Sequence, residues 1–279
     1  MKKALVAVAI LAALGTAHAQ FKIGGKIAYD IKRADNSATT VSPMDTSNIN
    51  FTATESVGNG ITVRAYAEIQ PGGNGTAAEG NDMYVDVATR VGSVRVGQIE
   101  SANGIIGLGL GDAPVIGQDG VVLGAKSNVQ SISYTTPAVS GLAFKVSNTR
   151  AINNTGTNKN AFGATYTVGA VSSAVDYNQS TERVRASAKV VVKGITVGAG
   201  VSRNELKVAD SAVIGASYTV GAVTVGAAYS DGNGTAKEYG AEYALSKRTA
   251  VQLAVAQVNS NKTTANNTDT YRVRVSHSF

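Results

Sequence analysis

Strict alternation of apolar and polar side chains is the feature that most limits what this chain can fold into. In "FKIGGKIAYDI", residues 21–31, apolar residues alternate with lysines, an alanine and an aspartate. The segment "GITVRAYAEIQ", residues 60–70, repeats the pattern with charges on one side only. Successive side chains of a β-strand point to opposite faces, whereas an amphipathic helix repeats about every 3.6 residues. The alternation therefore predicts strands with one apolar and one polar face, and almost no helix.

The alternation continues along the chain in segments of strand length. Short connections rich in glycine, such as "VGNG" and "VGAV", alternate with longer stretches rich in asparagine, threonine and glycine. This predicts antiparallel hairpins, with tight turns at one end of the sheet and longer loops at the other. Sixteen strands are predicted, over residues 21–31, 47–56, 60–70, 83–89, 92–99, 127–136, 141–149, 159–168, 171–179, 182–192, 195–203, 211–220, 223–230, 236–245, 249–259 and 270–279.

Two architectures accommodate this many antiparallel strands, a soluble β-sandwich and a membrane barrel. A sandwich core is expected to carry bulky Leu, Phe and Trp, but here the apolar face is mainly Val, Ala, Ile and Tyr, and the chain has no tryptophan. A continuous charged face is tolerated where it meets water. Closing the first strand on the last also removes both sheet edges. The sequence predicts an all-β fold, a transmembrane antiparallel β-barrel of 16 strands around a wet lumen.

Basic side chains recur on the polar face of the predicted strands. In "DTYRVRVSHSF", residues 269–279, two arginines alternate with valines, so they are expected to face the lumen. A basic lumen raises the local anion concentration, which predicts a mild preference for anions. The candidates for pore lining are Lys26, Arg64, Arg95, Lys145, Arg183, Arg185, Arg272 and Arg274.

The first residues predict export. "MKKALVAVAILAALGTAHA" has two lysines, an apolar run and an A-x-A site, the pattern of a cleaved secretory signal peptide over residues 1–19. The alternative, a membrane-spanning helix, needs about 20 apolar residues, and this run has about half that. Residues 20–279 are then expected to form a single barrel domain. Removal of Lys2 and Lys3 lowers the formal charge from +6 to +4, a spread-out excess that does not predict nucleic-acid binding.

With its signal peptide, sixteen alternating strands and final phenylalanine, the sequence resembles the general porins of Gram-negative bacteria, in particular those of the β-proteobacterial type. The resemblance covers the entire chain. It implies a homotrimer in the bacterial outer membrane, in contact with membrane lipid and lipopolysaccharide. It also implies that Phe279 serves as the signal read by the outer-membrane assembly machinery.

The segment 100–126 lies between the fifth and sixth predicted strands and matches the porin loop that folds into the barrel and narrows the channel. Connections of this length are usually functional or disordered, and this one is apolar for a disordered segment. Its acids, Glu100, Asp112 and Asp119, are the candidates to face the constriction, opposite basic residues of the wall. The alternative is an ordinary surface loop.

Other kinds of site find little support. "GLGLGD", residues 107–112, lacks the third glycine and the helix of a phosphate-binding loop. Beyond the signal peptide only His277 remains as a histidine, on the apolar face, and there is no cysteine, so neither an enzyme nor a metal or cofactor site is expected. We expect a channel for passive diffusion of small hydrophilic solutes and ions. The alternative is an adhesin or structural barrel working through its external loops.

Overall fold

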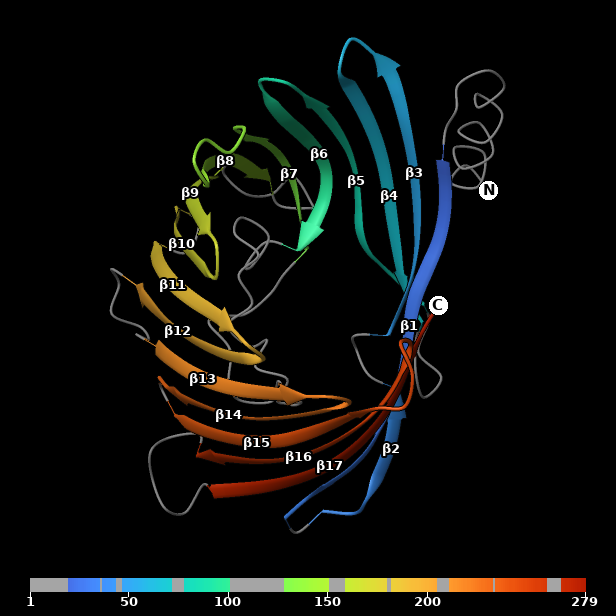
Figure 1. The fold of residues 1–279 in the computed structure, drawn as a ribbon, viewed down its shortest axis with the longest axis vertical. Helices are drawn as coiled ribbons and strands as arrows, with labels where there is room; N and C mark the ends of the chain where they lie inside the picture. The colour runs from blue at the N-terminus through green and yellow to red at the C-terminus, as the bar shows by residue number, and fades with distance from the viewer. Residues whose placement is uncertain are drawn as a thin grey trace.

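The computed structural model describes residues 20–35, 37–43, 47–71, 78–100, 128–150, 159–179, 182–204, 211–232, 234–259 and 267–279. These residues form one antiparallel sheet that curves around on itself (Figure 1). Within these ranges no helix is long and apolar enough to cross a membrane.

Every predicted strand corresponds to a strand of the structure. The main differences are that β1 runs further than expected, that β5 begins four residues earlier, and that an unpredicted short strand, β2, follows β1. The strands are β1 (Gln20–Ala34), β2 (Thr40–Pro43), β3 (Asn48–Gly58), β4 (Ile61–Gln70), β5 (Glu79–Thr89), β6 (Gly92–Glu100), β7 (Asn128–Thr135), β8 (Leu142–Arg150), β9 (Lys159–Val168), β10 (Val171–Asn178), β11 (Arg183–Val192), β12 (Ile195–Asn204), β13 (Ser211–Val220), β14 (Val223–Asp231), β15 (Thr235–Ala244), β16 (Thr249–Asn259) and β17 (Asn267–Ser278).

Pairing of the first strand with the last closes the barrel. β1 and β17 are antiparallel partners from Lys26 opposite Ser278 to Ala34 opposite Thr270. Beyond this ladder the Phe279 backbone exchanges two hydrogen bonds with Gly25, at 3.0 and 3.2 Å. A Cβ on Gly25 would lie 2.4 Å from the backbone carbonyl oxygen of Asn48 on β3 and 2.7 Å from the tip of the Phe279 ring, so only glycine fits at this position.

The strands β2 and β3 together occupy one position of the barrel, beside β1. β3 pairs with the first part of β1 and β2 pairs with its last part, both on the side of β1 opposite β17. The structure is therefore a closed barrel of 16 strand positions, as the sequence predicts.

The hydroxyl of Ser47 bridges the interval between β2 and β3. It accepts a hydrogen bond from the Ala28 N–H at 3.0 Å and donates one to the Ala28 carbonyl at 3.1 Å. Both residues are buried, Ala28 fully. A side chain thus takes the place that a backbone partner has elsewhere in the ladder, which keeps Ala28 satisfied where water does not reach.

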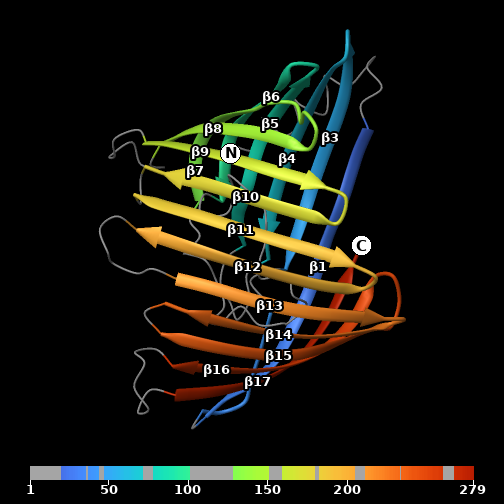
Figure 2. The ribbon, with the colours of Figure 1, turned by 60° about the vertical axis from the view of Figure 1, so that its left-hand side comes forward.

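The tight turns gather at one end of the barrel, as the lengths of the connections predict. Figure 2 shows the turns that join β9 to β10, β11 to β12 and β13 to β14 side by side at one end of the strands. Gly141, Gly169, Gly194 and Gly221 in these and neighbouring turns all have positive φ, the backbone conformation that favours glycine in tight hairpins.

The apolar side chains do not form an interior core. Large apolar residues of the outer face are widely exposed, for example Val225 at 47% and Leu253 at 54%. Among the described residues the buried apolar set is mostly alanine, and aspartate, arginine and serine are buried on the opposite face. This excludes a β-sandwich, whose apolar faces would be packed against each other.

Replacing Ser47 with alanine is expected to destabilise the barrel by about 1–3 kcal/mol, because it leaves a buried N–H and a buried carbonyl of Ala28 without partners. Guanidinium unfolding in detergent micelles, followed by the electrophoretic shift of the folded barrel, measures the change. Ser173→Ala, on the outer face of β10, is the matched control, with an expected change within about 0.5 kcal/mol. Equal effects of the two substitutions would contradict the bridging role of Ser47.

Candidate functional site on the inner face

The inner face of the barrel carries the charges, as strand parity predicts. On β17 the exposure of successive side chains alternates, with Arg272 and Arg274 buried and Val273 and Val275 exposed. Side chains converge on a concave face and cover one another, whereas they diverge on a convex face. The arginines therefore lie inside and the valines outside.

One charged cluster spans β4, β5 and β6. Asp86 lies directly across from Arg64 on one side and from Arg95 on the other. The Arg64 Nε donates to Asp86 at 3.0 Å, and the Arg95 Nε donates to it at 2.6 Å. Two guanidinium groups thus share one carboxylate, so the three side chains carry one net positive charge. Lys145 on β8 interacts electrostatically with both Arg95 and Asp86.

Two tyrosines and an acid extend this cluster along the wall. Tyr84 packs against both guanidiniums, with Arg95 3.9 Å and Arg64 5.5 Å from its ring centroid. The Tyr66 ring stacks on Tyr84 at 4.9 Å, and its hydroxyl donates to Glu68 at 2.6 Å. Cation–π contact and stacking hold these side chains against the wall.

A second cluster crosses the closing seam. Asp30 on β1 accepts hydrogen bonds from Arg274 on β17 at 2.7 and 3.0 Å, and Arg272 lies 3.2 Å away. The row continues straight across the sheet, because Arg274 is opposite Gln252 on β16, which is opposite Glu242 on β15. The Gln252 amide donates to Glu242. Charged hydrogen bonds therefore link the first strand to the last three.

The third cluster is an ion pair between β10 and β11. Arg185 lies opposite Asp176 and donates to it through Nε at 2.9 Å, with a second bond from its terminal nitrogen. The remaining basic candidates of the described wall are placed by register on the same inner face. They are Lys26 on β1, opposite Asn48 and Ser278, and Arg183 on β11, opposite Asn178.

The acidic residues that pair with the basic side chains of the wall were not predicted from the sequence. Asp86 and Asp176 were not identified as candidates, and Asp30 was assigned only to the polar face of its strand. The turn at Thr89–Gly92 fixes the register that places Asp86 opposite Arg95, so this pair was accessible from hairpin geometry. The Asp30–Arg274 pair is separated by 244 positions and depends on closure of the barrel.

The predicted constriction loop lies outside the described residues, and with it Asp112 and Asp119. Glu100 is the last residue of β6. Phe279 lies at the closing seam, where its backbone is hydrogen-bonded to Gly25. His277 lies on the outer face, where its Nδ1 is 2.9 Å from the Thr249 hydroxyl. Among the described residues no group of three or more His, Cys, Asp or Glu side chains is placed to hold a metal ion.

Comparison with known proteins identifies a family to which the sequence matches and solved barrels of similar fold. The family model described as Gram-negative porin matches residues 4–263. Two variants of the Rh. blastica porin superpose with TM-scores of 0.75 and 0.76 at 20% identity, over 93% of this chain and 100% of theirs. A loop-deletion mutant of OmpT, an outer membrane protein of Vibrio cholerae, has a TM-score of 0.73 at 11% identity, over 94% of this chain and 99% of its own. A search of curated proteins gave no significant match. At these identities the likeness of structure concerns the fold.

The seam cluster predicts a strong effect on stability. Asp30→Asn removes the carboxylate that faces two buried arginines, so we expect the free energy of unfolding to fall by about 3 kcal/mol. Guanidinium unfolding of the refolded barrel measures the loss. Adding Arg274→Gln is expected to recover part of it, because one unneutralised charge is then removed. Strictly additive losses in the double variant would show that the two side chains are not coupled.

Proposed function

Since the chain belongs to the family of Gram-negative porins and forms an outer-membrane channel, we propose that it passes small hydrophilic solutes and ions by passive diffusion, with a mild preference for anions. The observation that carries the proposal is the inner wall, where charged clusters occur on β1, β4–β6, β10–β11 and β15–β17. These strands lie on different sides of the barrel (Figure 1). Charges placed around the circumference of a barrel are favourable where water fills the lumen.

The preference for anions rests on the charges of the inner wall. Arg64 and Arg95 share Asp86, and Arg272 and Arg274 share Asp30, so two arginines face each of these aspartates. Glu68 and Glu242 at the edges of the two clusters offset this excess. The positive balance of the wall then comes from the further inner-face bases Lys26, Lys145 and Arg183. A positive wall raises the local concentration of anions and lowers that of cations.

The constriction remains a proposal based on sequence. Residues 100–126 are assigned to narrow the lumen, with Glu100, Asp112 and Asp119 toward the wall that carries Arg64 and Arg95. Deleting this segment is expected to raise the single-channel conductance. An unchanged conductance would count against the assignment.

We also propose that three copies associate through the outer faces near the closing seam. Phe21 on β1 and Phe51 on β3 stack at 6.5 Å, and Ala53 and Ala65 lie opposite each other on the same outer face of β3 and β4. Small side chains beside an aromatic pair allow a neighbouring barrel to approach closely. Chemical cross-linking in membranes should give a trimer, and recovery of monomer alone would argue against it.

The two ends of the chain are proposed to direct export and outer-membrane assembly. Residues 1–19 are assigned as a signal peptide removed before Gln20, and Phe279 as the signal for the outer-membrane assembly machinery. Lipopolysaccharide is expected as the lipid around the outer leaflet. The mass of the protein isolated from outer membranes tests the cleavage site directly, and a mass that includes residues 1–19 would refute it.

Charge-changing substitutions in the β4–β6 cluster should shift ion selectivity in opposite directions. Asp86→Asn adds one positive charge and is expected to raise the anion-to-cation permeability ratio by about twofold, while Arg64→Gln with Arg95→Gln removes two positive charges and is expected to lower the ratio by a larger factor. Reversal potentials in a KCl gradient across a planar bilayer measure the ratio.

The control for this experiment is Glu55→Gln, whose side chain lies on the outer face of β3, opposite Val63. It makes the same kind of charge change away from the lumen and should leave the ratio unchanged. A wild-type protein with cation-selective reversal potentials would contradict the anion preference, and a folded barrel that never conducts would contradict the channel.

A further inference from the structure

A stack of planar side chains runs along the inner wall from β6 to β4. The Arg95 guanidinium lies 3.9 Å from the centroid of the Tyr84 ring, and the Tyr66 ring lies 4.9 Å from it at an interplanar angle of 20°. The distance between the two rings matches the spacing of neighbouring strands, about 4.8 Å. Each strand therefore contributes one layer of the stack, and a further layer beside Tyr66 would lie over the next strand, β3.

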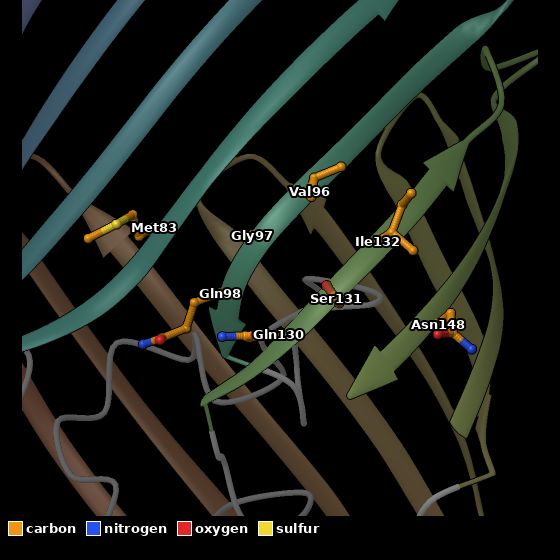
Figure 3. Close-up of a pocket in the computed structure, with 8 residues that line it drawn as sticks. All are labelled: Met83, Val96, Gly97, Gln98, Gln130, Ser131, Ile132 and Asn148. Atoms are coloured by element: carbon orange, nitrogen blue, oxygen red, sulfur yellow. The ribbon is translucent and has the colours of Figure 1, made fainter. Parts of the chain in front are cut away.

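The β6 end of the stack depends on a glycine. Gly97 lies directly opposite Tyr84, with Ser131 next to it on β7 (Figure 3). A Cβ on Gly97 would lie 2.5 Å from the Tyr84 Cα and 2.7 Å from the Tyr84 Cβ. Any side chain here would displace Tyr84, whereas glycine leaves that side of the ring to the Arg95 guanidinium.

The other end of the stack is the Tyr66 ring. Directly opposite Tyr66 on β3 is Thr52, and directly opposite Thr52 on β1 is Lys22, which is exposed and has the inward parity of Asp30. Within the described part of the chain, Tyr66 makes no ring or cation contact on its Thr52 side. Over β3 this row therefore carries a short side chain between an aromatic face and an amine.

Arg64 borders the same position with an unused hydrogen-bonding edge. Its Nε donates to Asp86 at 3.0 Å, and its Nη2 donates to Asp86 and, at 3.3 Å, to the Tyr84 hydroxyl. Nη1, on the opposite edge of the guanidinium, has no hydrogen-bond partner among the described residues. The Arg64 side chain is 41% exposed, against 6% for Arg274 at the seam, so a solute in the lumen can reach it.

The inward neighbours of Tyr66 along β4 have opposite charges. Arg64 precedes it, and Glu68 follows it. The Glu68 carboxylate accepts hydrogen bonds from the Tyr66 hydroxyl at 2.6 Å and from the Asn81 amide at 2.8 Å. An anionic group over Thr52 is therefore attracted toward Arg64 and repelled from the Glu68 end. A planar acid at this position takes one orientation, with its carboxylate at Arg64.

We propose that the position bounded by Lys22, Thr52, Arg64 and Tyr66 binds small planar aromatic monocarboxylates such as benzoate. The ring stacks on Tyr66 as the next layer, the carboxylate accepts hydrogen bonds from Arg64 Nη1, and Lys22 adds positive charge on the far side. The inference deepens the proposed function, on which its role in permeation rests. It names a class of solute that is held at the wall on its way through the lumen.

Equilibrium dialysis of radiolabelled benzoate against the folded barrel in detergent micelles tests the site without a measurement of current. Unlabelled benzoate is expected to displace the label at about one fifth of the concentration that cyclohexanecarboxylate requires. The two acids have the same charge and similar size, but only benzoate has an aromatic face. Equal displacement by both acids, or no saturable binding of benzoate, would overturn the proposal.

Substitutions around the position make the test specific to it. Thr52→Phe places a ring on β3 where the ligand is proposed to lie, so it should abolish benzoate binding while Tyr66 and Arg64 stay in place. Tyr66→Leu should weaken binding about fivefold, and Arg64→Gln about tenfold. The electrophoretic shift of the folded barrel shows that each variant is folded. Unchanged affinity in folded Thr52→Phe would overturn the proposal.

The matched control is Tyr239→Leu, which removes an exposed aromatic ring from the outer face of β15. It should leave the affinity for benzoate unchanged. A loss as large as that in Tyr66→Leu would mean that benzoate binds at the outer surface among the detergent, and would overturn the proposal.

Single-channel recording separates this inference from the proposed function. Benzoate added at constant ionic strength should produce brief interruptions of the current more often than cyclohexanecarboxylate does. A barrel that conducts but does not distinguish the two acids would overturn the aromatic site and leave the channel proposal intact. A barrel that binds benzoate selectively but never conducts would support the site and overturn the channel.

Discussion

Hydrogen-bonded closure between β1 and β17 is the interaction on which the rest of the barrel depends. A sheet with an apolar outer face has no water on that side to satisfy backbone groups, so its edges must pair with each other. The Phe279 backbone extends the ladder onto Gly25, and the Ser47 hydroxyl completes it where β2 gives way to β3. Closure then fixes which face is concave, and hence which side chains are gathered around the lumen.

The inner wall is organised as rows of directly opposed partners. Asp86 sits between two arginines on neighbouring strands, and Asp30 faces Arg274 across the seam. Each aspartate orients the guanidiniums and neutralises part of their charge, so the wall has an ordered field with a modest positive excess rather than a row of free cations. The same pairs stabilise the barrel, so its stability and the selectivity proposed for it depend on the same side chains.

Much of this architecture could be predicted from the sequence, because the alternation of side chains is read directly from the chain. The strand count, the inward direction of Arg272 and Arg274, and the exposed valines between them follow from a period of two. The Asp30–Arg274 pair and the break bridged by Ser47 could not be predicted, since they depend on the register between strands distant in sequence. β2 escaped prediction because four residues are too few to show an alternation.

The barrel is expected to turn its polar face to water and its apolar face to lipid. Single cysteines along β10 test this in membranes, because the chain has none of its own. A charged, membrane-impermeant thiol reagent should label Ser172→Cys and Ala174→Cys on the inner face, and should spare Val171→Cys and Val175→Cys on the outer face. Equal labelling of the two faces, or labelling of the outer pair alone, would contradict this account.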